Sequence, residues 1–121
     1  MSAAPDHLEQ FRVPAKRADH LIELGFSPAE IYKIVAPRRT LDRRKKSAEL
    51  LTIPESDRVV RMERIVTLAV RVFGDADKAH RWLRTPNRAL NGLVPLDLLE
   101  SENGAHKVEG LVYAVEHGMF S

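Results

Sequence analysis

Six basic side chains crowd into the nine positions from Arg38 to Lys46 of this 121-residue chain. Like charges at this density repel one another unless an anion lies against them, so the cluster indicates contact with a polyanion. Guanidinium groups form paired hydrogen bonds with phosphate and guanine, and a threonine among them can contact phosphate or a thymine methyl group. We therefore predict a DNA-contacting set: Arg38, Arg39, Thr40, Arg43 and Arg44. The alternative is a solvated basic surface that binds nothing.

The charge of the chain is divided unevenly between its two halves. Residues 1–73 carry 14 Lys and Arg against 10 Asp and Glu, a net charge of +4. Residues 74–121 carry 5 against 7, a net charge of −2, so the overall charge of +2 hides the difference. The polyanion contact is therefore expected in the first half.

Residues suited to catalysis or metal binding are hard to find. None of the five histidines, at positions 7, 20, 80, 106 and 117, lies four residues from another in the manner of a helical zinc site. The sequence has no cysteine, no glycine-rich phosphate loop and no Gly-x-Ser-x-Gly motif. Its carboxylates stand mainly at helix starts, where capping explains them. We predict no enzymatic activity, no metal and no cofactor.

The hydropathy pattern gives no sign of a membrane or an export signal. The longest apolar runs are a few residues, whereas a transmembrane helix needs about 20. The first ten residues lack the basic and then apolar pattern of a secretory signal. The absence of cysteine suits a reducing compartment. We expect a cytoplasmic protein that does not contact a membrane.

The end of the sequence carries two large apolar side chains, in the order His117, Gly118, Met119, Phe120 and Ser121. Large apolar side chains near a chain end lower solubility unless they are covered. They either fold back onto this chain or insert into another protein, and composition alone leaves both possibilities open.

Helix signals recur along the chain, whereas the alternation typical of strands is rare. The sequence Ser27-Pro28-Ala29-Glu30 is a capping box with proline at the first helical position, so a helix should begin there and end at Ala36-Pro37. A basic helix over residues 38–46 should follow, with Leu41 as its sole strong apolar residue. Two helices joined by this tight turn have the form of a helix-turn-helix, whose second helix enters the major groove of DNA.

Further helices are predicted downstream, over residues 54–73, 75–84, 95–99 and from Ser101 nearly to the end. Gly74 should stop the longest of them. The sequence therefore predicts an all-α fold in three parts. These are an N-terminal arm over residues 1–15 that is loosely held until it docks, a helix-turn-helix region over residues 16–73, and a small helical domain over residues 74–121.

An ordered series of residues in the second half carries a resemblance: Phe73-Gly74-Asp75, Lys78-Ala79, Trp82-Leu83, Thr85-Pro86-Asn87, Ala89-Leu90, Gly92, Pro95-Leu96-Asp97-Leu98-Leu99, Gly104-Ala105, Val108-Glu109 and Glu116-His117-Gly118. This series resembles the toxin-binding domain of the Xre/MbcA/ParS antitoxins, which are partners of RES-domain toxins. A second, upstream series resembles the degenerate helix-turn-helix of the same family. It consists of Pro37-Arg38-Arg39-Thr40-Leu41, Arg43-Arg44, Leu51-Thr52 and Glu55-Ser56-Asp57-Arg58. The resemblance covers roughly residues 20–121 and is more specific than any single short motif.

The resemblance implies an all-helical, dimeric antitoxin of a type II toxin–antitoxin system. It implies that the C-terminal domain binds a RES-domain toxin and obstructs an active site that consumes NAD or transfers ADP-ribose. It also implies that the helix-turn-helix represses the antitoxin's own operon through the basic cluster. By the same resemblance, the toxin contacts fall on the outer face of the last helix and the chain end: Val115, His117, Gly118, Met119, Phe120 and Ser121.

Two other readings stay open at this point: a helix-turn-helix transcription regulator without a toxin, and an antitoxin that has lost DNA binding. Two departures from the family pattern bear on detail. The turn at Ala36-Pro37 lacks the glycine that many helix-turn-helix units place there. Val94 precedes Pro95 where relatives often have serine or threonine, so the helix that begins at Pro95 should lack a side-chain cap.

Overall fold

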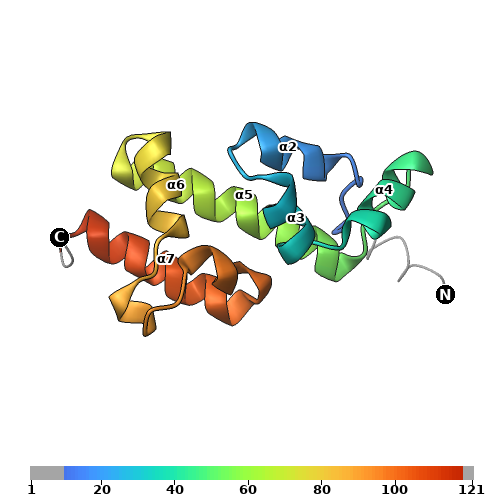
Figure 1. The fold of residues 1–121 in the computed structure, drawn as a ribbon. Helices are drawn as coiled ribbons and strands as arrows, with labels where there is room; N and C mark the ends of the chain where they lie inside the picture. Colours follow the sequence, from blue (N-terminus) through green and yellow to red (C-terminus); the bar gives the residue numbers. More distant parts are fainter. Residues whose placement is uncertain (1–9, 119–121) are drawn as a thin grey trace. The chain divides into compact units, whose positions relative to one another are not determined.

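The computed structural model describes residues 10–118, and this part of the chain is all-α, as the sequence predicts (Figure 1). Its α-helices are α2 (Arg17–Glu23), α3 (Pro28–Ile34), α4 (Arg38–Lys46), α5 (Ile53–Phe73), α6 (Ala76–Arg84) and α7 (Glu102–Glu116). Two 3-10 helices, η1 (Arg88–Leu90) and η2 (Pro95–Glu100), lie between α6 and α7. The helix predicted to begin at Pro95 is therefore present in 3-10 form, and Val94 before it gives no side-chain cap, as expected.

The chain divides into two compact units, and the division falls inside α5, between Val60 and Arg61. We expected a boundary at Gly74, directly after α5. The side chains of α5 explain the difference. Arg61 donates hydrogen bonds to the Leu99 carbonyl and the Glu102 carboxylate, which hold the second part of α5 to the C-terminal elements.

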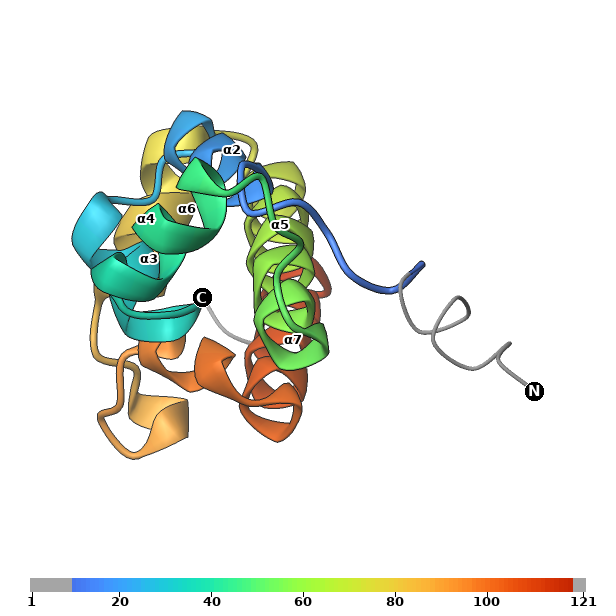
Figure 2. The same cartoon turned by 90° about the vertical axis from the view of Figure 1, so that its right-hand side faces the viewer.

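The N-terminal unit buries apolar side chains from each of its helices and from the links between them: Leu21, Phe26, Ile31, Ile34, Leu41, Leu51 and Val59. Figure 2 shows α2, α3 and α4 grouped together in this unit. The predicted capping box starts α3, because Ser27 Oγ accepts a hydrogen bond from the Glu30 N–H and the Glu30 carboxylate accepts one from the Ser27 N–H. These two bonds satisfy backbone donors that the helix itself leaves unpaired.

The turn between α3 and α4 contains no glycine, and its backbone requires none. Val35 has a φ of −84° and Pro37 a φ of −57°, both ordinary for L-amino acids. Among the non-glycine residues that the structure describes, positive φ occurs at Ala48 and Asn91, outside this turn. The departure from the glycine-containing pattern therefore introduces no backbone strain.

The end of the expected N-terminal arm is hydrogen-bonded to the segment that links α4 to α5. The Arg12 guanidinium donates to the carbonyls of Leu50 and Leu51, at 3.4 and 2.7 Å. The Leu51 N–H donates to the Val13 carbonyl, and the Val13 N–H donates to Ser56 Oγ. We expected an arm over residues 1–15 that is loosely held until it docks, and these bonds dock Arg12 and Val13 onto the N-terminal unit.

The backbones of η2 and α7 come close together in the C-terminal unit, where η2 meets the first turn of α7. Ser101 caps α7 by accepting a hydrogen bond from the Gly104 N–H, as the sequence predicts. Gly104 is buried, and a Cβ atom at this position would collide with the Leu98 carbonyl oxygen. The absence of a side chain at Gly104 is therefore what lets η2 lie against α7.

Candidate functional site

Helix α4 has one face turned toward its own unit and one face turned outward. Leu41 is 1% exposed and marks the inner face. Because an α-helix turns by 100° per residue, Arg39 and Arg43 lie on the opposite side, and Lys46 follows them at a further three residues. All three side chains belong to exposed residues. They form a row of positive charge, which we call the basic face, and Lys46 is a member that the sequence-based set omits.

The other members of the predicted set that precede Leu41 lie near the start of α4. The Arg38 side chain is 76% exposed and forms an ion pair of 3.5 Å with Asp42, one turn later. Thr40 is half-buried. Pro37 caps α4 without a side-chain hydrogen bond, so the first N–H groups of the helix are not satisfied by a capping side chain. Such N–H groups together with Arg38 can bind a phosphate oxygen.

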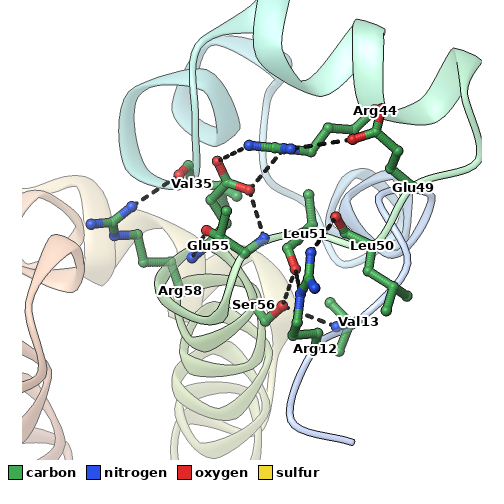
Figure 3. Close-up of polar contacts among 11 residues, drawn as sticks. Arg12, Val13, Val35, Arg44, Glu49, Leu50, Leu51, Glu55, Ser56 and Arg58 are labelled. Atoms are coloured by element: carbon green, nitrogen blue, oxygen red, sulfur yellow. Dashed lines mark hydrogen bonds and ion pairs between the residues drawn. The ribbon is translucent and has the colours of Figure 1, made fainter. Parts of the chain in front are cut away.

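Arg44 differs from the rest of the predicted set because its side chain points into the N-terminal unit (Figure 3). It is 15% exposed, and its Nε lies 3.0 Å from the Glu55 carboxylate. Its guanidinium also donates to the other Glu55 oxygen at 3.3 Å and to Glu49 at 3.4 Å. The structure therefore gives Arg44 two carboxylate partners from its own chain and separates it from Arg39 and Arg43.

Glu55 holds together the start of α5 and the end of α4. Its carboxylate accepts the Thr52 N–H at 2.9 Å, and its own N–H donates to Thr52 Oγ, which is a second capping box. Burial raises the pKa of the Glu55 carboxyl, but the hydrogen bonds from Thr52 and Arg44 outweigh it and leave the pKa below its ordinary value. The carboxylate is therefore ionised and bound to Arg44 at neutral pH. The spacing Thr52-x-x-Glu55 is the sequence signal that we missed, because Pro54 suggested a later start of the helix.

Two further contacts hold α4 in the N-terminal unit. Arg58, one turn after Glu55 on α5, donates to the Val35 carbonyl in the turn that precedes α4 (Figure 3). Lys45 lies 3.0 Å from Asp19 of α2. Polar contacts from α5 thus reach the backbone just before α4 and the side chain of Arg44 in its last turn.

The C-terminal unit carries an open apolar groove of about 460 Å³. Its lining includes Phe73, Trp82, Leu111 and Val115, from α5, α6 and α7. The rings of Phe73 and Trp82 are 5.6 Å apart and inclined by 40°, a favourable aromatic arrangement. Val115, a predicted toxin contact, therefore lies in a groove. Trp82 is half-buried and forms part of the groove wall.

The other predicted toxin contacts come at and after the end of α7. His117 and Gly118 are exposed, and Gly118 ends the helix with a φ of +74°. A positive φ at this position is typical of glycine after a helix. Met119, Phe120 and Ser121 lie outside the described residues, so their assignment stays a prediction.

Residues 10–118 contain neither a candidate metal site nor a candidate membrane span. Within this range no group of three or more His, Asp or Glu side chains could hold a metal ion. No helix in the same range is both long and apolar enough to cross a membrane. The basic face and the apolar groove are therefore the two candidate binding surfaces.

Two family models match the chain, one for each surface. The antitoxin Xre-like helix-turn-helix domain matches residues 12–64, and the antitoxin Xre/MbcA/ParS C-terminal toxin-binding domain matches residues 68–118. The Antitoxin Xre of Yersinia enterocolitica is 41% identical over 90% of this chain and 86% of its own length. The chain belongs to the Xre/MbcA/ParS antitoxin family.

Other members of the antitoxin family agree with this assignment. The Antitoxin Xre of Pseudomonas putida is 38% identical over 81% of this chain, and the match spans 62% of that relative's length. The crystal structure of the MbcT–MbcA toxin–antitoxin complex of M. tuberculosis contains a chain that matches with a TM-score of 0.67 and 26% identity, over 88% of this chain and 96% of that chain. The helix-turn-helix match contains the basic face, and the toxin-binding match contains the groove.

Proposed function

We propose that this chain is the antitoxin of a type II toxin–antitoxin pair, acting by binding and not by catalysis. Its C-terminal unit binds a RES-domain toxin that consumes NAD or transfers ADP-ribose, and it obstructs the active site of that toxin. Its N-terminal unit binds operator DNA and represses the operon. One observation carries the proposal: two family models match this chain one after the other, an antitoxin helix-turn-helix domain and then a toxin-binding domain.

The apolar groove supports the proposal for the C-terminal unit. Its wall includes Phe73, Trp82, Leu111 and Val115, all inside the range of the toxin-binding model. An open apolar groove with two aromatic rings is suited to an apolar side chain of a partner protein. We propose that the toxin occupies this groove and also contacts His117, Gly118, Met119, Phe120 and Ser121.

The basic face supports the proposal for the N-terminal unit. Arg39, Arg43 and Lys46 form a cationic row on the second helix of a helix-turn-helix, which is the helix that enters the major groove in this class of proteins. We propose that Arg38 and Thr40 at the start of α4 contact the phosphate backbone. Because such proteins commonly read two half-sites with two subunits, we also propose that the antitoxin binds its operator as a homodimer.

The proposed function is tested by co-expressing the antitoxin with the product of the neighbouring gene, measuring growth and co-purification. We expect the antitoxin to restore growth and to co-purify with the toxin. Val115→Lys should weaken the complex by about tenfold or more, because a buried, unpaired charge in an apolar contact costs more than about 1.4 kcal/mol. The matched control is His106→Lys on the same helix, whose side chain is 68% exposed and does not line the groove.

The outcome also separates the alternatives that the sequence leaves open. Operator binding without any toxin partner would favour a transcription regulator and contradict the antitoxin role. Toxin neutralisation without operator binding would favour an antitoxin that has lost autorepression. Equal toxin binding by the Val115→Lys variant and the unsubstituted chain would remove the groove from the proposed interface.

A further inference from the structure

Helix α4 has few contacts that fix its rotation about its own axis. Leu41 is its single buried apolar residue, and one point of apolar contact leaves a helix able to roll. Arg44 lies three residues later on the same side of the helix, so its contact with Glu55 adds a second fixed point beside the ion pair of Lys45 with Asp19. The direction of Arg39 and Arg43 depends on this rotation, because they lie on the opposite side.

Glu55 is placed to hold Arg44 in one position. The Thr52 N–H fixes one carboxylate oxygen of Glu55, and the Glu55 residue is itself only 9% exposed. Its carboxylate meets the Arg44 guanidinium at 3.0 and 3.3 Å (Figure 3). Arg12 donates to the Leu50 and Leu51 carbonyls, which holds the link between α4 and α5.

We infer that Glu55 is a positioning residue for DNA binding: through Arg44 it sets the rotation of α4 that directs the basic face outward. The inference rests on the proposed DNA-binding function and goes beyond it, because Glu55 is an acidic residue that touches no DNA. Arg44 is then a positioning residue as well, and not one of the phosphate contacts.

The inference predicts that Glu55→Gln changes the affinity for DNA in the direction opposite to the one expected from charge alone. Glu55→Gln removes a negative charge close to a DNA-binding helix, and removal of such a charge should strengthen binding to a polyanion. Loss of the Arg44 contact should instead weaken it, since affinity falls with the fraction of molecules in the binding orientation. Glutamine can keep the capping contacts with Thr52, so the substitution removes mainly the ion pair.

The experiment measures binding of the full-length antitoxin to a labelled duplex covering the promoter of its own gene, with an unrelated duplex for comparison. We expect Glu55→Gln to weaken promoter binding about tenfold, the result of roughly one molecule in ten keeping the binding orientation. The matched control is Glu23→Gln, which makes the same charge change at an exposed carboxylate of α2 in the same unit. The control should bind DNA as tightly as the unsubstituted chain or more tightly.

Two further measurements separate positioning from loss of folding. Binding is measured at a temperature where circular dichroism shows every variant fully helical, so that unfolded molecules contribute nothing. In an Arg44→Gln background, Glu55→Gln should have no further effect on affinity, because the two residues act as one unit.

Unchanged or tighter promoter binding by Glu55→Gln, or fully additive effects of the two substitutions, would overturn the inference and leave the proposed function intact. Failure of the unsubstituted chain to bind the promoter duplex would overturn the DNA part of the proposed function, and this inference with it.

Discussion

At the scale of single residues, Arg43 and Arg44 show how little a count of charges says about a binding surface. They are neighbours in the sequence and both were assigned to DNA, but successive helical side chains differ in direction by 100°. Arg43 is exposed on the basic face, and Arg44 is 15% exposed between two carboxylates. One guanidinium is available to an external phosphate, whereas the other already has internal partners.

This difference predicts distinct effects of the same substitution at adjacent positions. Arg43→Gln should make DNA binding less dependent on salt. The slope of log K against log salt concentration should become shallower by about 0.9, because one phosphate contact contributes that amount. This substitution should leave the free energy of unfolding nearly unchanged, since the Arg43 side chain is exposed. Arg44→Gln should keep the salt slope and lower the free energy of unfolding by about 1.5–3 kcal/mol, because charged hydrogen bonds are lost and Glu55 keeps its charge. Fluorescence anisotropy at several salt concentrations and urea denaturation measure the two quantities. A reduced salt slope in Arg44→Gln would return Arg44 to the DNA contacts.

At the scale of the elements, the sequence predicts helices and caps well and contacts between distant segments poorly. The bounds of α4 and the caps at Ser27, Asp75 and Ser101 follow from short-range chemistry, and the structure has all of them. The cap at Thr52 was also readable in the sequence. The hydrogen bonds of Arg12 were not, because they join residues 38 and 39 positions apart along irregular backbone that has no periodic pattern.

The candidate sites divide in the same way. The basic face was predictable as a cluster of residue types, and its inward and outward members could be separated once Leu41 was taken as the inner face. The groove was not predictable, since its walls come from α5, α6 and α7 and the sequence does not state how these helices are placed. Trp82 lies in the wall of this groove, although the core is the more common location for a lone tryptophan on an apolar helix face.

The junction of η2 with α7 gives a prediction at the same scale, from two glycines of one helix. Glycine in a helix is destabilising by about 0.5–1 kcal/mol relative to alanine, so replacement by alanine normally stabilises. Gly110→Ala should follow this rule, because a Cβ there meets nothing within 4 Å. Gly104→Ala should instead lower the free energy of unfolding by about 1–3 kcal/mol, because the new methyl group collides with the Leu98 carbonyl and forces η2 away from α7. Urea denaturation followed by the fluorescence of Trp82 measures both, and stabilisation by both substitutions would contradict the close approach.

At the scale of the whole molecule, the chain carries two candidate surfaces on two compact units. The basic face belongs to the unit that ends at Val60, and the groove belongs to the unit that begins at Arg61. The charges of the two units agree with this arrangement, since residues 1–60 carry 11 Lys and Arg against 9 Asp and Glu, a net charge of +2, whereas residues 61–121 carry 8 against 8. Substitutions on one surface should therefore leave the binding partner of the other surface unaffected, which makes the two proposed functions separable by mutation.

The chain end provides the clearest test of this separation. Deletion of Met119, Phe120 and Ser121 should impair neutralisation of the toxin, because two large apolar side chains would be lost from the proposed interface. The deletion begins after Gly118, where α7 has already ended, so the helical circular dichroism should be unchanged. Promoter binding should also be unchanged, because the basic face belongs to the other unit. Growth rescue, circular dichroism and promoter binding are measured on the same variant.

Full growth rescue by the shortened chain would remove these three residues from the toxin contacts. Loss of helicity would mean that they act through folding of the C-terminal unit and not through the toxin.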